Sequence, residues 1–126
     1  MSNNILADAL SAIKNSERVG KEECVILNSK LIRDFLNVIK TGKYIESFKE
    51  SADKRKLTVK LSKRINDINV ITPRFSVKSD EMDKWERRFL PAKGFGALIL
   101  TTSKGVMNNS NAKEQKTGGK LLGFVY

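Results

Sequence analysis

The first half of the chain carries two segments whose apolar residues recur at helical spacing. Residues 4–15 and 30–40 each gather these residues on one face, which predicts two amphipathic helices. The apolar positions are Ile5, Leu6, Ala9, Leu10 and Ile13 in the first segment, and Leu31, Ile32, Phe35, Leu36 and Ile39 in the second. Asn28 and Ser29 are candidate caps for the second helix, and Gly42 is its candidate stop.

Shorter segments of this half have the features of β-strands. Residues 56–61 alternate between polar and apolar side chains, which is typical of a strand with one buried face. Residues 24–27 and 44–49 predict two more strands, and the polar residues 50–55 predict a hairpin tip. The α-β-α-β-β order predicts two helices on one face of a three-stranded sheet.

The second half is predicted to be mainly β with short helices, after a polar linker. The linker is predicted in residues 62–69, strands in residues 70–77, 95–100 and 121–126, and short helical segments in residues 80–89 and 108–115. Pro73 cannot donate to a strand ladder, so the first of these strands should be bulged or lie at an edge. Trp85 is predicted to be a core residue rather than a base-stacking platform.

These elements predict an α/β (α+β) fold of two domains. Residues 1–66 would form an α-β-α-β-β two-layer domain, packed against a mainly β domain, with short helices, in residues 67–126. A chain of 126 residues is long enough for one domain or for two small halves that share a surface.

The charge of the chain points to a polyanionic partner. Lys and Arg number 24 against 14 Asp and Glu, which gives a net charge of +10. In a folded protein such an excess favours RNA or DNA first and an anionic membrane second. No segment has the length and apolarity of a membrane span, and the first four residues do not resemble the start of a secretory signal.

The composition argues against an enzyme. The chain has no histidine, so a Ser-His-Asp or Cys-His arrangement is impossible. The single cysteine, Cys24, is predicted to be a core residue, and with no histidine it gives too few ligands for zinc. Gly118, Gly119 and Lys120 lack the spacing of a phosphate-binding loop. We therefore predict no catalytic residue, metal, cofactor or small-molecule substrate.

Three hydroxyl residues and a lysine follow the apolar segment 95–100. Thr101, Thr102, Ser103 and Lys104 would place closely spaced donors and acceptors at the end of a rigid strand. Small hydroxyls suit the shallow minor groove of A-form RNA, where 2′-hydroxyls are displayed, and a lysine can pair with a phosphate. The alternative is a strand that turns, with hydroxyls that bond their own backbone.

Further polar and basic clusters are candidates for the same partner. The stretch from Lys116 through Thr117, Gly118 and Gly119 to Lys120 could form an anion nest that a ligand approaches closely. Other candidates are Lys14 and Asn15, with Lys30, and the basic hairpin tip that contains Arg55. Each cluster alone is equally typical of a solvated face, or of cations near a helix end.

The order and spacing of these motifs resemble the universal small-subunit ribosomal protein 8 family, in its archaeal and eukaryotic branch. The resemblance runs the full length. Its motifs lie in residues 4–15, in Ile-Thr-Pro-Arg-Phe at 71–75, in Lys-Trp-Glu at 84–86, in Leu-Thr-Thr-Ser at 100–103 and in Lys-Thr-Gly-Gly-Lys-Leu-Leu-Gly-Phe at 116–124. Relatives usually carry an acidic-then-basic helix with two arginines where this chain has residues 108–115.

The resemblance implies a structural protein that binds the central domain of small-subunit rRNA. It implies a principal contact at residues 101–104, with secondary contacts near Lys14, Asn15, Lys30 and the 117–119 turn. Adding the basic clusters, the predicted RNA-binding residues are Thr101, Thr102, Ser103, Lys104, Lys116, Thr117, Gly118, Gly119, Lys14, Asn15, Lys30 and Arg55.

The expected partners are small-subunit rRNA and neighbouring small-subunit proteins, and the expected location is the cytoplasmic ribosome. No membrane contact is expected. The alternative is a non-ribosomal RNA-binding protein or a translational repressor.

Overall fold

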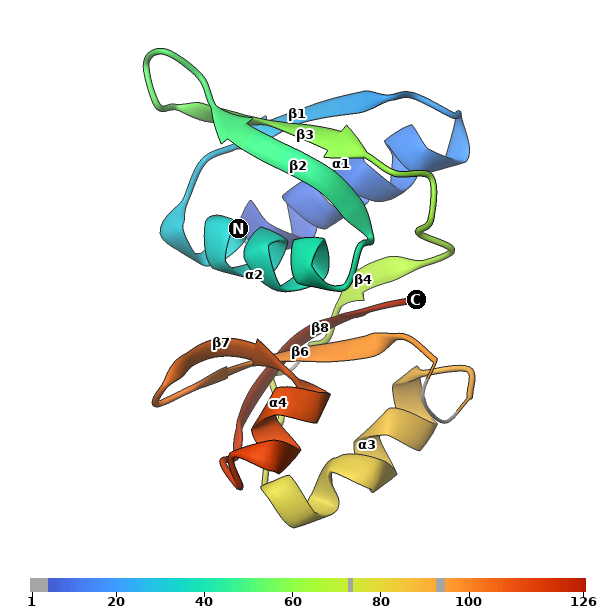
Figure 1. Ribbon diagram of the computed structural model, residues 1–126, viewed down its shortest axis with the longest axis vertical. Coiled ribbons are helices and arrows are strands. Elements are labelled where there is room, and N and C mark those ends of the chain that lie inside the picture. Colours follow the sequence, from blue (N-terminus) through green and yellow to red (C-terminus); the bar gives the residue numbers. More distant parts are fainter. Residues whose placement is uncertain (1–4, 73, 93–94) are drawn as a thin grey trace.

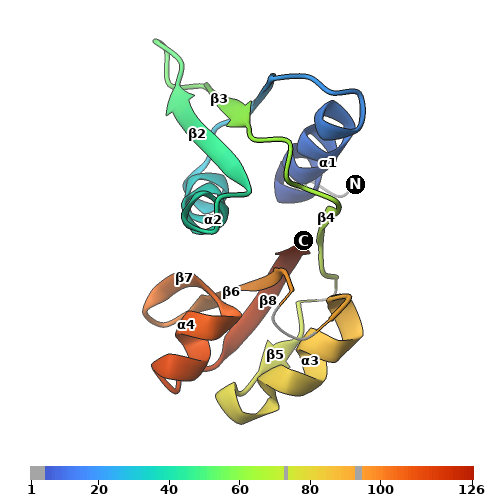
Figure 2. The same ribbon diagram turned by 45° about the vertical axis from the view of Figure 1, so that its right-hand side comes forward.

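The protein is built of four alternating layers, stacked along its longest axis. The computed structural model describes residues 5–72, 74–92 and 95–126. Figure 1 shows, from top to bottom, a sheet, a pair of helices, a second sheet and a second pair of helices, and Figure 2 shows the same order from another side. Both sheets are antiparallel. The α/β (α+β) class predicted from the sequence is confirmed.

The first half forms the upper sheet and its helices in the predicted α-β-α-β-β order. The elements are α1 (Ile5–Arg18), β1 (Glu23–Leu27), α2 (Lys30–Thr41), β2 (Ile45–Glu50) and β3 (Lys56–Leu61), with β3 at the centre of the sheet. The Ser29 hydroxyl accepts a hydrogen bond from the Ile32 amide (3.2 Å), as expected of a helix cap. Burial alternates along β3 as its sequence predicts.

The second half forms the lower sheet around its last strand. The elements are β4 (Ile68–Val70), β5 (Ser76–Val77), a 3₁₀ turn (Ser79–Glu81), α3 (Met82–Phe89), β6 (Ala97–Thr102), β7 (Gly105–Asn108), α4 (Asn109–Glu114) and β8 (Gly119–Val125). The strand order is β4-β8-β6-β7, and β5 also pairs with β8. Trp85 on α3 is buried, as predicted.

The continuous strand predicted at 70–77 is wrong. Two short strands, β4 and β5, occupy this region, and each pairs with a different part of β8. Pro73 lies outside the described residues, so the bulge or edge position expected of it stays a prediction. β4 begins inside the predicted linker because Ile68, an apolar residue between Asp67 and Asn69, is buried against the apolar core of the first half.

The lower sheet is buried on both faces. Ile99 and Leu122 pack against α1 and α2 in one apolar cluster, whereas Leu98, Leu100 and Leu121 pack in a second cluster with α3 and α4. Burial on both faces explains the unbroken apolar run in β6. Since the first cluster contains residues of both halves, the division into domains 1–66 and 67–126 stays a prediction.

Candidate nucleic-acid interface

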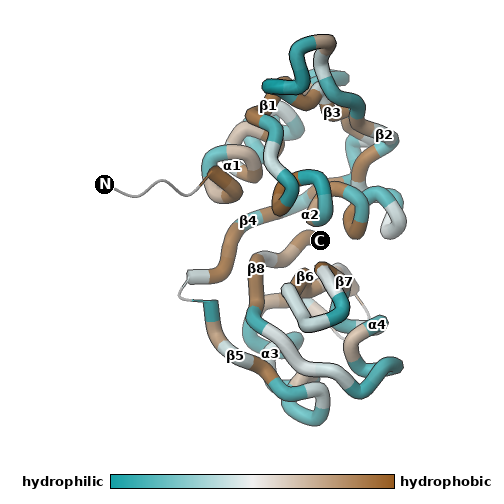
Figure 3. Tube along the Cα trace, turned by 90° about the vertical axis from the view of Figure 1, so that its left-hand side faces the viewer, coloured by the Kyte–Doolittle hydropathy of each residue, from teal (hydrophilic) through white to brown (hydrophobic). Residues whose placement is uncertain are grey.

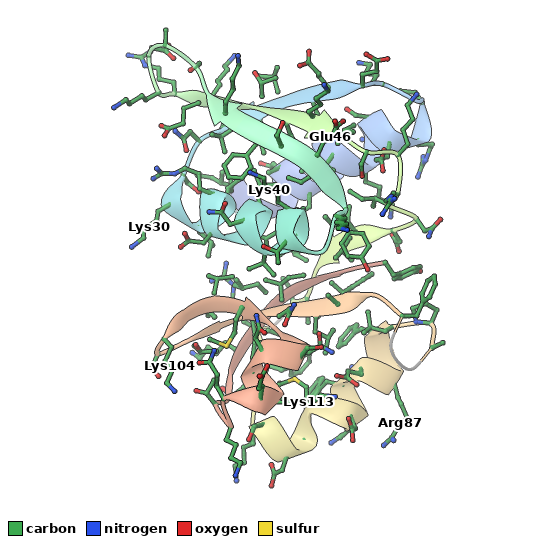
Figure 4. The ribbon with its side chains drawn as sticks, in the orientation of Figure 1. Lys30, Lys40, Glu46, Arg87, Lys104 and Lys113 are labelled. Carbon is green, nitrogen blue, oxygen red and sulfur yellow. The ribbon has the colours of Figure 1, made fainter. Side chains whose placement is uncertain are left out.

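The hairpin of β6 and β7 presents the hydroxyl motif at one edge of the lower sheet. Thr101 and Thr102 end β6, Ser103 and Lys104 form the turn, and Gly105 begins β7. The two turn residues are exposed, and the two threonines are partly buried. Figure 4 shows Lys104 at the left-hand tip of this hairpin. Small hydroxyls and a cation therefore stand on a backbone that the sheet holds in place.

The three hydroxyls of this hairpin differ in their hydrogen bonds. The Thr102 hydroxyl donates to the Gly105 carbonyl oxygen (2.8 Å) and accepts from the Lys104 amide (3.1 Å), so it closes the turn. No hydrogen bond within the described residues engages the hydroxyl of Thr101 or Ser103. The backbone-bonding alternative therefore applies to Thr102, whereas the other two hydroxyls remain open to a ligand.

The second C-terminal motif lies beside this hairpin because β8 pairs with β6. Lys120 is opposite Thr101, and Gly119 is opposite Thr102. Directly opposed residues point to the same face of a sheet, so Lys120 adds a cation beside the open Thr101 hydroxyl. The exposed Lys116 and the partly buried Thr117 lead into β8 from the end of α4. Two motifs separated along the sequence thus form one polar and basic surface.

The two glycines of this motif make room for the protein's own strands. A Cβ added to Gly119 would overlap the Thr101 carbonyl oxygen, and one added to Gly118 would overlap the Val77 carbonyl oxygen. Their small size therefore allows β8 to approach β6 and β5. This is a different role from the close approach of a ligand that the sequence suggested.

Lys30 lies on the same side of the molecule as the hairpin. It is the first residue of α2 and lines a groove of about 420 Å³ between α2 and β7. The polar lining of this groove also includes Asp34, Asn37, Thr41 and Asn108. Figure 3 turns this side to the viewer and shows the tip of β6 and β7 directly below α2. The groove places the cation within the same surface as the hydroxyl tip.

Lys14 and Asn15 lie elsewhere. Figure 1 shows that the end of α1, which carries them, is on the opposite side of the molecule from the start of α2. The Lys14 ammonium group is 2.9 Å from a carboxylate oxygen of Asp67, so this cation is already paired. Asn15 is exposed beside it. The structure therefore does not bring these two residues together with Lys30.

Arg55 lies at the tip of the β2–β3 hairpin, near the start of α2. Its carbonyl oxygen accepts a hydrogen bond from the amide of Asn28 (3.0 Å), two residues before Lys30. Figure 1 shows this tip and the start of α2 both at the left. The Arg55 side chain is exposed, and its amide donates to the Asp53 carboxylate (3.2 Å). Hydrogen bonds from Ser51 and then from the Arg55 amide lower the pKa of Asp53 below its usual value. This turn is thus fixed by its own polar groups, and Arg55 extends from it into solvent.

Comparison with known proteins decides the family. The chain matches the model of ribosomal protein S8 over residues 4–126. The chain belongs to the ribosomal protein S8 family. Small ribosomal subunit protein uS8 of Methanosphaerula palustris is 48% identical over 98% of this chain and 97% of its own length. The protein of that name from Methanococcoides burtonii is 51% identical over 96% and 95%, and uS8A of Saccharomyces cerevisiae is 45% identical over 98% and 97%.

Membership in this family gives the protein a structural role in the ribosome and no enzymatic one. The archaeal and yeast relatives confirm the branch that the sequence motifs indicate. Among the described residues, no helix combines the length and apolarity needed to cross a membrane.

The segment in which this S8 family member departs from the expected pattern forms a polar network. The side chain of Asn109, on α4, accepts a hydrogen bond from the Leu98 amide (3.3 Å) and donates to the Glu86 carboxylate of α3. Lys113 lies 2.7 Å from the same carboxylate and 3.0 Å from Asp83. Sequence reasoning missed this network because its partners lie on different elements.

The network predicts a loss of stability at alkaline pH. Hydrogen bonding to Glu86 raises the pKa of Lys113, despite the opposing effect of burial. The raised pKa means that Lys113 contributes to stability through its charged form. This contribution is fully present below the pKa of lysine in the unfolded chain, and it is lost as pH rises through the higher pKa of the folded state. From about pH 9 to about pH 11.5, the melting temperature should fall more for the parent than for Lys113→Met.

The matched control is Lys21→Met, at an exposed position with no ion pair among the described residues. It should follow the parent. An equal fall for Lys113→Met and the parent would show that the ion pairs of Lys113 contribute nothing to stability.

Proposed function

We propose that the protein is a component of the small ribosomal subunit that binds small-subunit rRNA and stabilises its fold. Its relatives are named as proteins of that subunit. The observation that carries the proposal is the hairpin tip, where the open hydroxyls of Thr101 and Ser103 lie beside Lys104 and Lys120. The protein's excess of positive charge provides the general attraction for RNA.

The chemistry of the tip fits an A-form RNA helix, and the family resemblance implies a helix with an irregular internal loop. The minor groove of such a helix is wide and shallow, and it displays 2′-hydroxyls and base edges. The short side chains of Thr101 and Ser103 can exchange hydrogen bonds with these groups, whereas Lys104, Lys116 and Lys120 are long enough to meet flanking phosphates. Thr102 would contribute indirectly, because its hydroxyl closes the turn.

Lys30 would extend this surface across the groove to α2. Arg55 would add a cation at the β2–β3 tip, near the start of α2. Asn15 would serve a separate contact with another part of the rRNA or with a neighbouring ribosomal protein, because the end of α1 lies on the opposite side of the molecule. Lys14 stays paired with Asp67. The proposed action is mechanical: a rigid protein surface holds the RNA in its folded shape.

The test is the affinity for a fragment of small-subunit rRNA from the central domain that contains such an internal loop. Ser103→Ala should weaken binding about 5-fold, the loss of one hydrogen bond of about 1 kcal/mol. Lys104→Ala should weaken binding and reduce the slope of log affinity against log salt by about 1. Fluorescence anisotropy over a range of salt concentrations measures both effects.

Ser47→Ala is the matched control, since Ser47 is an exposed serine on β2 of the other half. It should bind like the parent. If Ser103→Ala and Lys104→Ala both bound like this control, the hairpin would not be the RNA contact.

A further inference from the structure

A second groove lies at the other end of α2, away from the hydroxyl hairpin. It has a volume of about 410 Å³ and lies between the two halves of the chain. Its lining includes Lys43, Tyr44, Arg64, Phe95, Gly96 and Tyr126. In Figure 1 the end of α2 and the C-terminus are at the right, whereas the β6–β7 hairpin is at the left. We call this site the aromatic groove.

The aromatic groove combines ring surfaces with positive charge. Phe95 is 51% exposed, and it is the one aromatic side chain among the exposed large apolar residues of the described part of the chain. Lys43 and Arg64 are both exposed, and none of the described residues that line the groove is acidic. Asp67 reaches the Tyr126 hydroxyl from nearby, but its carboxylate is paired with Lys14 at 2.9 Å. The groove is therefore cationic as well as aromatic.

The wall formed by Lys43 and Tyr44 is held by specific contacts. The Ser62 hydroxyl donates to the carbonyl oxygens of Tyr44 (2.8 Å) and Lys43 (3.2 Å). A Cβ on Gly42 would lie 3.1 Å from the Tyr44 ring, so glycine allows this ring to pack across the end of the helix. This wall is therefore pre-formed.

The floor of the groove is also tightly packed. Gly96 has a φ of +91°, and a Cβ there would lie 2.6 Å from the Cβ of Tyr126. Only glycine therefore lets the chain pass this close to Tyr126 and carry Phe95 into the groove. Tyr126 stacks on Phe124 with ring centroids 5.9 Å apart, and Phe124 stacks in turn on Phe89. Phe95 thus stands beside a floor anchored in the core.

We propose that the aromatic groove binds a single-stranded RNA segment, with an unpaired base stacked on Phe95 and phosphates paired with Lys43 and Arg64. Exposed rings interleaved with cations recognise unpaired nucleotides, because every base offers a flat face and every linkage a negative charge. An acidic peptide would pair with the cations but would leave the Phe95 ring without a flat partner. This contact does not depend on the hydroxyl hairpin, which faces the other side.

The test is the binding of a fluorescein-labelled uridine octanucleotide to the full chain, followed by fluorescence anisotropy. Stacking of one base contributes about 1–3 kcal/mol, so Phe95→Ala should weaken binding by about 5- to 150-fold. Phe95→Leu, which keeps an apolar side chain without a ring, should weaken it similarly, whereas Phe95→Trp should retain it. Arg64→Gln should reduce the salt slope by about 0.7, as expected for one phosphate of a single strand.

Three outcomes would overturn the proposal. The first is a parent protein that does not bind the octanucleotide, and the second is a Phe95→Leu variant that binds like the parent. The third is a glutamate octapeptide that displaces the RNA more strongly than unlabelled octanucleotide does, which would favour an acidic protein segment. Circular dichroism melts check that each variant is folded, which is expected because Phe95 is half-exposed.

Ser103→Ala separates this proposal from the hairpin contact. It should weaken binding to the rRNA fragment with the internal loop and leave octanucleotide binding unchanged. Phe95→Ala should weaken octanucleotide binding with little effect on that fragment. The two binding measurements therefore test the hairpin contact and the aromatic groove separately.

Discussion

Gly119→Ala should destabilise the protein by about 3 kcal/mol, the upper end of the range for a methyl group forced into a packed site. The added Cβ would overlap the Thr101 carbonyl oxygen and lie 2.9 Å from the Thr102 side-chain methyl. Neither group can move freely, because both belong to β6, which is paired on both sides and buried on both faces. The strain would therefore spread along the β6–β8 ladder. Urea unfolding followed by circular dichroism measures the loss.

Gly20→Ala is the matched control. Gly20 has a φ of +77°, and no atom of the described residues lies within 4 Å of the added Cβ, so its substitution carries only the backbone cost of about 1–2 kcal/mol. An equal loss in the two variants would mean that the approach of β8 to β6 leaves more room than the structure shows. Gly119→Ala should also weaken binding of the rRNA fragment, because the hydroxyl hairpin depends on the same strand pair.

The local part of the fold is predictable because its signals are carried by neighbouring residues. The apolar stripe of residues 30–40 is one face of α2, and the Ser29 cap acts on an amide three residues away. The alternation in residues 56–61 corresponds to β3 at the centre of its sheet. Periodicity and capping need no knowledge of the rest of the chain.

The part of the fold that the sequence does not predict depends on contacts between segments distant in sequence. Ile68 lies in a polar stretch, and only its burial against the first-half core marks β4. The predicted strand at 70–77 divides because β8 offers two separate places for pairing. The purpose of Gly118 and Gly119 is equally invisible in sequence, since the atoms that exclude a Cβ belong to β5 and β6.

The candidate site shows the same limit. The motif at 101–104 is recognisable from residue type and order, but only the hydrogen bonds distinguish Thr102, which closes the turn, from Thr101 and Ser103. Lys120 joins the site through strand register, and Lys14 is paired with an acid from the next half. Residue type therefore predicts the chemistry of the site, whereas tertiary contacts decide which side chains remain available.

Asn109→Ala should lower the free energy of unfolding by about 2–3 kcal/mol, because it leaves buried groups without partners. The Leu98 amide would lose its acceptor, and the Glu86 carboxylate, in a residue only 9% exposed, would lose a donor while it keeps Lys113. Removing the amide also deletes the hydrogen bonds that join α4 to β6 and to α3, while the ion pairs of Lys113 still link α4 to α3.

The matched control for this loss is Asn111→Ala, an exposed position on the same short helix. It should change stability by no more than about 0.5 kcal/mol, as is usual for a surface site. Glu86→Gln tests the charge separately: a neutral amide can still accept from Asn109, so it should cost less than Asn109→Ala if the hydrogen bonds dominate. A larger loss for Glu86→Gln would instead assign the stability of the α3–α4 contact to the ion pair with Lys113. Urea unfolding of the three variants distinguishes the contribution of the hydrogen bonds from that of the ion pair.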